Sequence, residues 1–86
     1  MARSRKATKS LWSAEHRALC ALLVAARRKA GLKQDDVAEK LGRPQSYVAK
    51  YEGGERRIDV VEFLDIARAL GRDPMHLLRA LTKARS

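Results

Sequence analysis

Three polar residues near the middle of the chain have the types and spacing for hydrogen-bonding chemistry. Gln45, Ser46 and Lys50 fall on one side of the chain if this segment is helical, and no carboxylate shares that side. An amide and a hydroxyl both donate and accept hydrogen bonds, whereas an ammonium only donates. These groups match the donors and acceptors on the edges of nucleic-acid bases. The segment therefore has the chemistry of recognition rather than of bond breaking.

The charge of the chain indicates a polyanionic partner. The 86 residues include 19 Lys and Arg against 10 Asp and Glu, a formal net charge of +9. Such an excess suits nucleic acid or an anionic membrane surface. No apolar run approaches the ~20 residues needed to cross a bilayer, and the N-terminus lacks the long apolar segment of a secretory signal. We therefore expect a cytoplasmic protein.

Catalysis and metal binding have no recognisable pattern in this sequence. No Ser/His/Asp, Cys/His or paired-carboxylate arrangement is visible, and His16 and His76 are isolated from each other. His16 has no second ligand at metal-binding spacing, so we expect it on the surface. Cys20 is the single cysteine, and its alanine- and leucine-rich surroundings predict a buried, unreactive thiol. We expect no enzyme activity, no cofactor and no metal.

Residues 34–53, which include the polar trio, have the spacing of two short helices joined by a glycine turn. Apolar residues recur at helical spacing on both sides of the turn: Val37, Ala38 and Leu41 before it, and Val48 and Tyr51 after it. Gly42 stands where a helix ends in the left-handed conformation, and Pro44 suits the first turn of the next helix. Ala38 leaves room where two helices cross closely. This pattern predicts a helix-turn-helix; the alternative is an ordinary helical hairpin.

Helical patterns also lie on both sides of this stretch. The preceding helix, capped by Ser13, carries an apolar stripe formed by Leu19, Leu22, Leu23, Ala26 and Ala30. Asp59 and Glu62 have the spacing of a capping box, ahead of a predicted core face formed by Phe63, Leu64, Ala67 and Leu70. Asp73 and Pro74 open a last helix. With no strand pattern, we expect an all-α five-helix domain over residues 13–82, a basic flexible arm over 1–12 and a short basic tail over 83–86.

About 60 residues, 19–78, resemble the phage-repressor and Cro-type helix-turn-helix family, also called the XRE family. The matching segments are LVAARRKAGLKQDDVAEKLG, QSYVAKYEGGERR, FLDIARALG and DPMHLL. The resemblance implies a lambda-repressor-like bundle of five helices from bacteria or phage. It also implies binding to operator DNA as a dimer in the nucleoid, often with repression of transcription. The sequence departs from the family pattern at Lys33, where a capping hydroxyl is usual, at Pro44 and at Ile58.

The resemblance also assigns roles to single residues. The second helix of the motif lies in the major groove, which implies base reading by Gln45, Ser46 and Lys50, with Tyr47 at the edge of that face. Contacts to the DNA backbone are expected from Lys33, Gln34, Arg43, Arg56 and Arg57. The family pairs an acid at the end of this helix with an arginine of the first helix. That pairing implies a structural ion pair between Glu52 and Arg27.

The last helix carries more apolar surface than the end of a small bundle needs. Its apolar residues are Met75, Leu77, Leu78 and Leu81. We expect Leu77 and Leu78 to be divided between core and partner, with Met75 and Leu81 nearer the boundary of a homodimer on a palindromic operator. The alternative is that all four only cap the core. A rival function is an antitoxin or another protein-interaction module built on the same fold.

Overall fold

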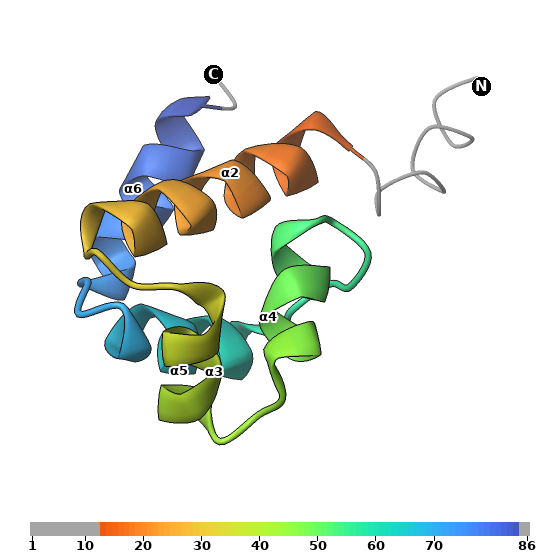
Figure 1. Ribbon diagram of the computed structural model, residues 1–86. Coiled ribbons are helices and arrows are strands. Elements are labelled where there is room, and N and C mark those ends of the chain that lie inside the picture. Colours follow the sequence, from red (N-terminus) through yellow and green to blue (C-terminus); the bar gives the residue numbers. More distant parts are fainter. Residues whose placement is uncertain (1–12, 85–86) are drawn as a thin grey trace.

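The computed structural model describes residues 13–84, in which five α-helices and no strand occur (Figure 1). The helices are α2 (Ala14–Lys29), α3 (Gln34–Leu41), α4 (Gln45–Glu52), α5 (Val60–Ala69) and α6 (Pro74–Ala84). The predicted all-α class is therefore confirmed. The predicted basic arm, residues 1–12, lies outside the described residues, as does the end of the basic tail.

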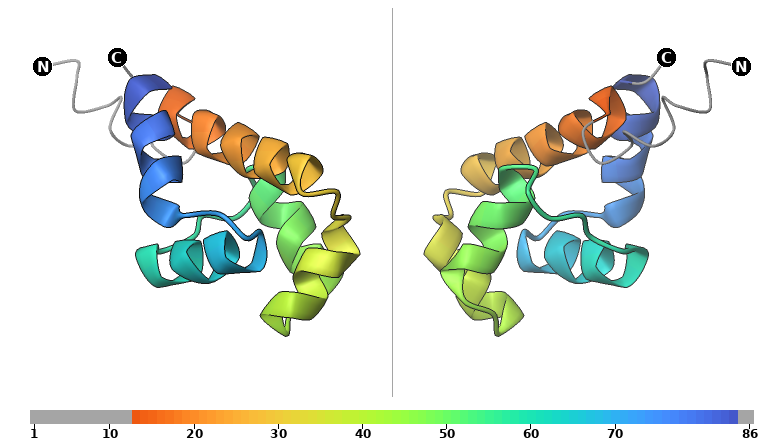
Figure 2. Two further views of the ribbon diagram at one scale, coloured as in Figure 1. Left: turned by 90° about the vertical axis from the view of Figure 1, so that its left-hand side faces the viewer. Right: turned by 90° about the vertical axis from the view of Figure 1, so that its right-hand side faces the viewer.

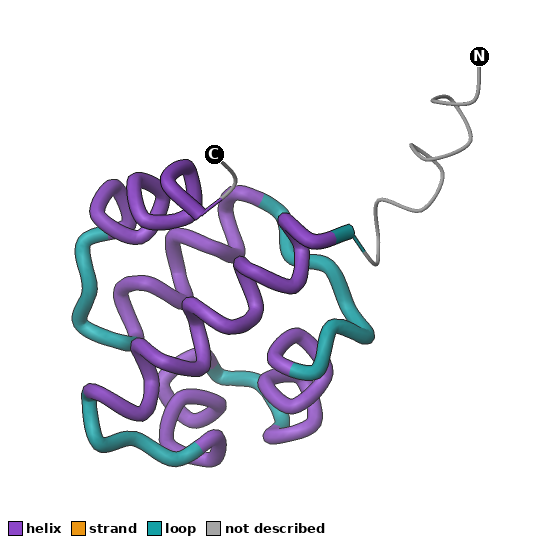
Figure 3. Tube along the Cα trace, turned by 90° about the horizontal axis from the view of Figure 1, so that it is seen from above, coloured by secondary structure: helices purple, strands orange, loops and turns teal. Residues whose placement is uncertain are grey.

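The helices enclose one core beneath the longest helix. α2 lies along one side of the molecule with α3, α4 and α5 below it, and α6 packs against both α2 and α5 (Figure 2). Seen from above, α2 runs diagonally through the middle of the molecule, with α6 beside it (Figure 3). Every helix sends side chains into the core, and the largest that are fully buried are Leu23, Val37, Val48 and Ile66. The core therefore holds α3 and α4 at a fixed angle to each other.

The helix ends are stabilised largely as the sequence predicts. The Ser13 hydroxyl accepts the His16 N–H at 3.1 Å. Asp59 and Glu62 form the predicted capping box, since Asp59 Oδ1 accepts the Glu62 N–H at 2.7 Å and Glu62 Oε1 accepts the Asp59 N–H at 2.9 Å. At the start of α3, an ammonium has no acceptor to offer. There, only the Asp36 carboxylate contributes, accepting the Lys33 N–H at 2.8 Å.

The turn between α3 and α4 has the predicted glycine geometry and a small difference at the proline. Gly42 has φ 67°, and the next N–H, of Arg43, donates to the Ala38 carbonyl at 3.0 Å, which ends α3. Pro44 precedes the first turn of α4 instead of lying in it. Its ψ of 156° is extended, and its carbonyl accepts the Tyr47 N–H at 3.0 Å. α4 therefore begins at Gln45.

Three predictions about the helix faces are wrong. His16 is buried, 7% exposed, and its Nε2 lies 3.8 Å from Cys20 Sγ. The buried face of α2 includes residues 16, 20 and 23. Ala30, which the sequence predicts on the apolar stripe, is instead the exposed C-cap residue of this helix. Leu64 is 42% exposed, because the core side of α5 is centred on Phe63, Ile66 and Ala67. Burial raises the pKa of the Cys20 thiol, which agrees with the unreactive cysteine predicted.

Candidate nucleic-acid interface

α4 presents the predicted polar trio to solvent. Val48 and Tyr51 on the opposite side of this helix are 0% and 2% exposed, which fixes the rotation of α4 about its axis. Gln45, Ser46 and Lys50 consequently lie exposed on the outer side. A short helix with a buried inner face and an exposed polar face can present its polar side chains to the major groove.

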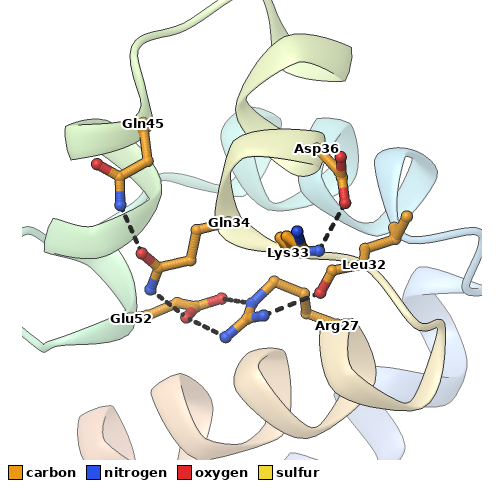
Figure 4. A network of polar contacts seen from close by, with 7 residues as sticks. All are labelled: Arg27, Leu32, Lys33, Gln34, Asp36, Gln45 and Glu52. Atoms are coloured by element: carbon orange, nitrogen blue, oxygen red, sulfur yellow. Dashed lines mark hydrogen bonds and ion pairs between the residues drawn. The ribbon is translucent and has the colours of Figure 1, made fainter.

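A relay of side chains joins this outer face to the core (Figure 4). Gln45 Nε2 donates to Gln34 Oε1 at 2.6 Å, and Gln34 Nε2 donates to Glu52 Oε1 at 2.9 Å. Glu52 in turn accepts hydrogen bonds from Arg27 of α2. Three helices therefore contribute to the position of one exposed amide, that of Gln45.

The acid in the relay determines which way each amide faces. A carboxylate only accepts hydrogen bonds, so Gln34 must turn its NH₂ group toward Glu52 and its carbonyl toward Gln45. Gln45 must then donate one N–H to that carbonyl. Its own carbonyl oxygen and its second N–H stay available on the exposed side.

The predicted ion pair between Arg27 and Glu52 is present. Arg27 Nε lies 2.7 Å from Glu52 Oε2, and Nη2 lies 3.1 Å from Oε1, in a two-pronged contact. The two side chains are only 12% and 5% exposed. The hydrogen bond to Glu52 raises the pKa of Arg27. Glu52, the one acid in α4, is thus neutralised and directed inward, away from the exposed face.

Tyr47 does not lie where a base-reading residue must. It is 8% exposed, and its ring packs edge-on against Tyr51 at a centroid distance of 5.6 Å. Desolvation by burial raises the pKa of its hydroxyl. The interpretation of Tyr47 as a base-reading residue is therefore withdrawn. Its spacing of four residues from Tyr51, a predicted core position, is the signal that could have shown this.

Arg56 forms an ion pair with Glu62 that was not expected from the sequence. Its Nη1 and Nη2 lie 3.1 and 2.8 Å from the two carboxylate oxygens of Glu62, and Nη1 donates to the Arg57 carbonyl at 2.7 Å. The hydrogen bonds from Arg56 lower the pKa of Glu62 most, and the hydrogen bond from the Asp59 N–H lowers it further, to about 2. Arg56 thus ties the loop after α4 to α5, and its expected contact with a phosphate stays a prediction. The sequence identified Glu62 only as a capping residue and missed its role in this ion pair.

The other four residues expected to contact the DNA backbone differ in exposure. Lys33, Arg43 and Arg57 are exposed, and Gln34 is half-buried at the start of α3. Within residues 13–84, no group of three or more His, Cys, Asp or Glu side chains has metal-binding geometry. The same part of the chain contains no helix whose length and apolar content would let it cross a membrane.

The apolar residues of α6 divide between core and surface. Leu77 is 3% exposed, whereas Leu78 and Met75 are 39% and 58% exposed and Leu81 is half-buried. α5 adds exposed apolar side chains that the sequence reading did not single out, Val60 at 73% and Val61 at 66%. Val60, Val61 and Leu64 share one side of α5 at helical spacing.

Comparison with known proteins agrees with this geometry. A family model described as a helix-turn-helix domain matches residues 18–81. An XRE-family-like protein from Pseudomonas syringae pv. tomato str. DC3000 is 48% identical, with a TM-score of 0.83 over 93% of this chain and 98% of that one. The restriction-modification controller protein C.AhdI from Aeromonas hydrophila is 32% identical, with a TM-score of 0.70 over 76% of this chain and 98% of that one.

A more distant relative has been solved on DNA. The controller protein C.Esp1396I, a tetramer in complex with its natural 35 base-pair operator, is 20% identical, with a TM-score of 0.76 over 83% of this chain and 93% of that one. At that identity the likeness shows the fold alone. No curated protein sequence matches the chain. The family match over residues 18–81 and the 48% identical structure together show that this chain belongs to the XRE family of helix-turn-helix DNA-binding regulators.

Proposed function

We propose that this protein is a repressor that binds a palindromic duplex operator as a homodimer, with α4 in the major groove. The observation that carries the proposal is the fixed, exposed amide of Gln45. A side chain that is held in one orientation before DNA arrives loses less conformational freedom when it contacts a base edge. The relay from Arg27 through Glu52 and Gln34 supplies that orientation.

Gln45 has the hydrogen-bonding groups to read adenine. Its carbonyl oxygen matches the N6 amino group, and its second N–H matches N7. The N–H given to Gln34 is not needed for that pair. Ser46 and Lys50 lie beside it, where lysine suits the O6 and N7 acceptors of guanine and serine discriminates little.

Contacts to phosphates would hold α4 in register on the duplex. We assign them to Gln34 at the start of α3 and to three exposed cations, Lys33, Arg43 and Arg57. With a formal net charge of +9, the protein would also meet DNA through long-range attraction.

Dimerisation would bring two recognition helices onto one operator. A single helix presents only about three or four side chains to base edges, and two-fold pairing doubles that readout at half-sites one helical turn apart. Met75, Leu78 and Leu81 of α6 form the surface we assign to the interface. The relative C.Esp1396I has been solved as an operator-bound tetramer, which supports self-association in this fold.

A titration against the DNA upstream of the protein's own gene tests the proposal. If ~6 phosphates are neutralised, the slope of log affinity against log salt should be about −5. Gln45→Ala should narrow the difference in binding free energy between cognate and scrambled duplex by ~1–3 kcal/mol. Gln34→Ala should weaken binding to both duplexes and, because it removes the hydrogen bond that orients Gln45, should also narrow part of that difference.

Two results would contradict this function. A slope near zero for the wild type would favour the rival reading, a protein-interaction module. Equal losses on cognate and scrambled duplex for Gln45→Ala would remove Gln45 from the base-reading set.

A further inference from the structure

The ring of Tyr47 lies against two guanidinium groups. The central carbons of Arg43 and Arg56 are 4.6 and 4.8 Å from the centroid of the ring. The ring itself is held by the core, since it is 8% exposed and packs edge-on against Tyr51. Both distances lie within the range of cation–π attraction. A buried tyrosine is thus a rigid platform for two cations at the surface.

The two arginines differ in what their N–H groups do. Arg56 gives its terminal nitrogens to Glu62 and to the Arg57 carbonyl. Arg43 is exposed, and it makes no ion pair or side-chain hydrogen bond with residues 13–84. Attraction between a guanidinium and a ring face takes up none of the five N–H donors of the arginine. Arg43 is therefore held against the ring, cationic and still able to donate.

We propose that Tyr47 is a positioning residue that holds the Arg43 guanidinium ready for a DNA phosphate. This inference rests on the proposed DNA binding, and it adds Tyr47 to the residues that set the affinity for DNA. Arg43 follows Gly42 in the turn between α3 and α4, two residues before the exposed Gln45. An arginine that is already ordered loses less conformational freedom when it binds, so affinity rises without any new contact.

Glu62 supports the same arrangement from the other side. It neutralises Arg56, so the ring does not lie beside two uncompensated positive charges. The Tyr47 hydroxyl is also one of the groups that lower the pKa of Glu62, after Arg56 and the Asp59 N–H. The ring face is what holds Arg43. The variant Tyr47→Phe removes the hydroxyl and keeps the ring face, whereas Tyr47→Leu removes both.

NMR of the protein without DNA tests the platform directly. The aromatic ring should shift the side-chain N–H signal of Arg43 away from its random-coil position. Tyr47→Phe should keep that shift, and Tyr47→Leu should abolish it. An unshifted Arg43 signal in the wild type would overturn the inference while leaving the proposed function untouched.

A double-mutant cycle on duplex DNA tests the consequence. Arg43→Ala and Tyr47→Leu should each weaken binding by between about 2-fold and 30-fold, and the double variant should be little weaker than either. Tyr47→Phe should bind within about twofold of the wild type if the ring face is the determinant. Fully multiplicative losses would overturn the inference.

Arg43→Lys supplies a comparison that leaves the core intact, because residue 43 is exposed. Lysine keeps the charge without the planar group that stacks. We expect Arg43→Lys to weaken duplex binding nearly as much as Arg43→Ala does. If Arg43→Lys binds duplex DNA as tightly as the wild type, Tyr47 does not position Arg43. If the wild type does not bind duplex DNA but the Arg43 signal is shifted, the proposed DNA binding is wrong. The contact between the Tyr47 ring and Arg43 is then still confirmed.

Discussion

At the scale of single residues, removing Glu52, the acid of α4, should change the stability of the fold most. Glu52 accepts hydrogen bonds from Arg27 and Gln34 and is 5% exposed. We predict that Glu52→Ala destabilises the fold by about 3–5 kcal/mol, because it leaves the Arg27 guanidinium largely buried without its partner. Urea unfolding measures the loss.

Glu39→Ala is the matched control for Glu52→Ala. Glu39 is an exposed acid on α3, so its removal should change stability by less than about 0.5 kcal/mol. An unchanged unfolding midpoint for Glu52→Ala would show that the ion pair contributes nothing net to the fold.

Glu62 should make the stability of the fold depend on acid pH. Arg56 and then the Asp59 N–H lower the pKa of Glu62 to about 2, from an ordinary value of 4.5. A pKa lowered by folding stabilises the protein above pH 4.5, and this contribution is lost as the pH falls from about 4.5 toward 2. We predict that Glu62→Gln flattens the pH dependence of the urea midpoint in this range.

Glu55→Gln serves as the comparison for that titration, since Glu55 is exposed in the same loop. It should leave the wild-type pH dependence in place. If Glu62→Gln and the wild type lose stability in parallel between pH 5 and 2.5, the ion pair with Arg56 does not carry the effect.

At the scale of elements, the turn between α3 and α4 depends on the backbone of one residue. Gly42 has φ 67°, and a Cβ built at this position would meet no atom within 4 Å. Gly42→Ala should therefore cost only the backbone penalty of the left-handed conformation, about 1–2 kcal/mol, measured as a lower melting temperature. Gly42→Asn should cost less, because asparagine adopts this conformation more readily. Equal losses for the two variants would argue against a purely backbone origin.

At the scale of the whole molecule, the exposed apolar residues of α6 predict self-association. Leu78→Glu should place a charge in the interface and give a folded monomer, because Leu78 is 39% exposed. Leu77→Ala should instead lower stability by about 2–5 kcal/mol, since Leu77 is 3% exposed and fills the core. Sedimentation at micromolar concentration separates the two effects.

The wild type should sediment at twice its chain mass of 9.6 kDa. Val61 lies on the exposed side of α5. If Val61→Glu also lowers the sedimentation mass to that of a monomer, the interface extends beyond α6. A wild type that stays at 9.6 kDa, with and without DNA, would contradict the homodimer.

Much of this fold can be predicted from the sequence because the signals are local. Apolar periodicity located the helices, the Asp59–Glu62 box and Ser13 marked their starts, and Gly42 marked the turn. The outward position of Gln45, Ser46 and Lys50 followed from the buried spacing of Val48 and Tyr51. Each inference uses residues within about one or two helical turns of one another.

What only the tertiary structure decided depends on distances between elements. Tyr47 and His16 are buried because packing sets how far each helix is rotated about its axis, and a shift of one residue turns a helix face by 100°. Arg56 meets Glu62 because a loop folds back onto α5. The relay from Glu52 to Gln45 likewise forms because the core holds α3 and α4 together. The sequence determined which groups could hydrogen-bond, and packing between helices decided which of them meet.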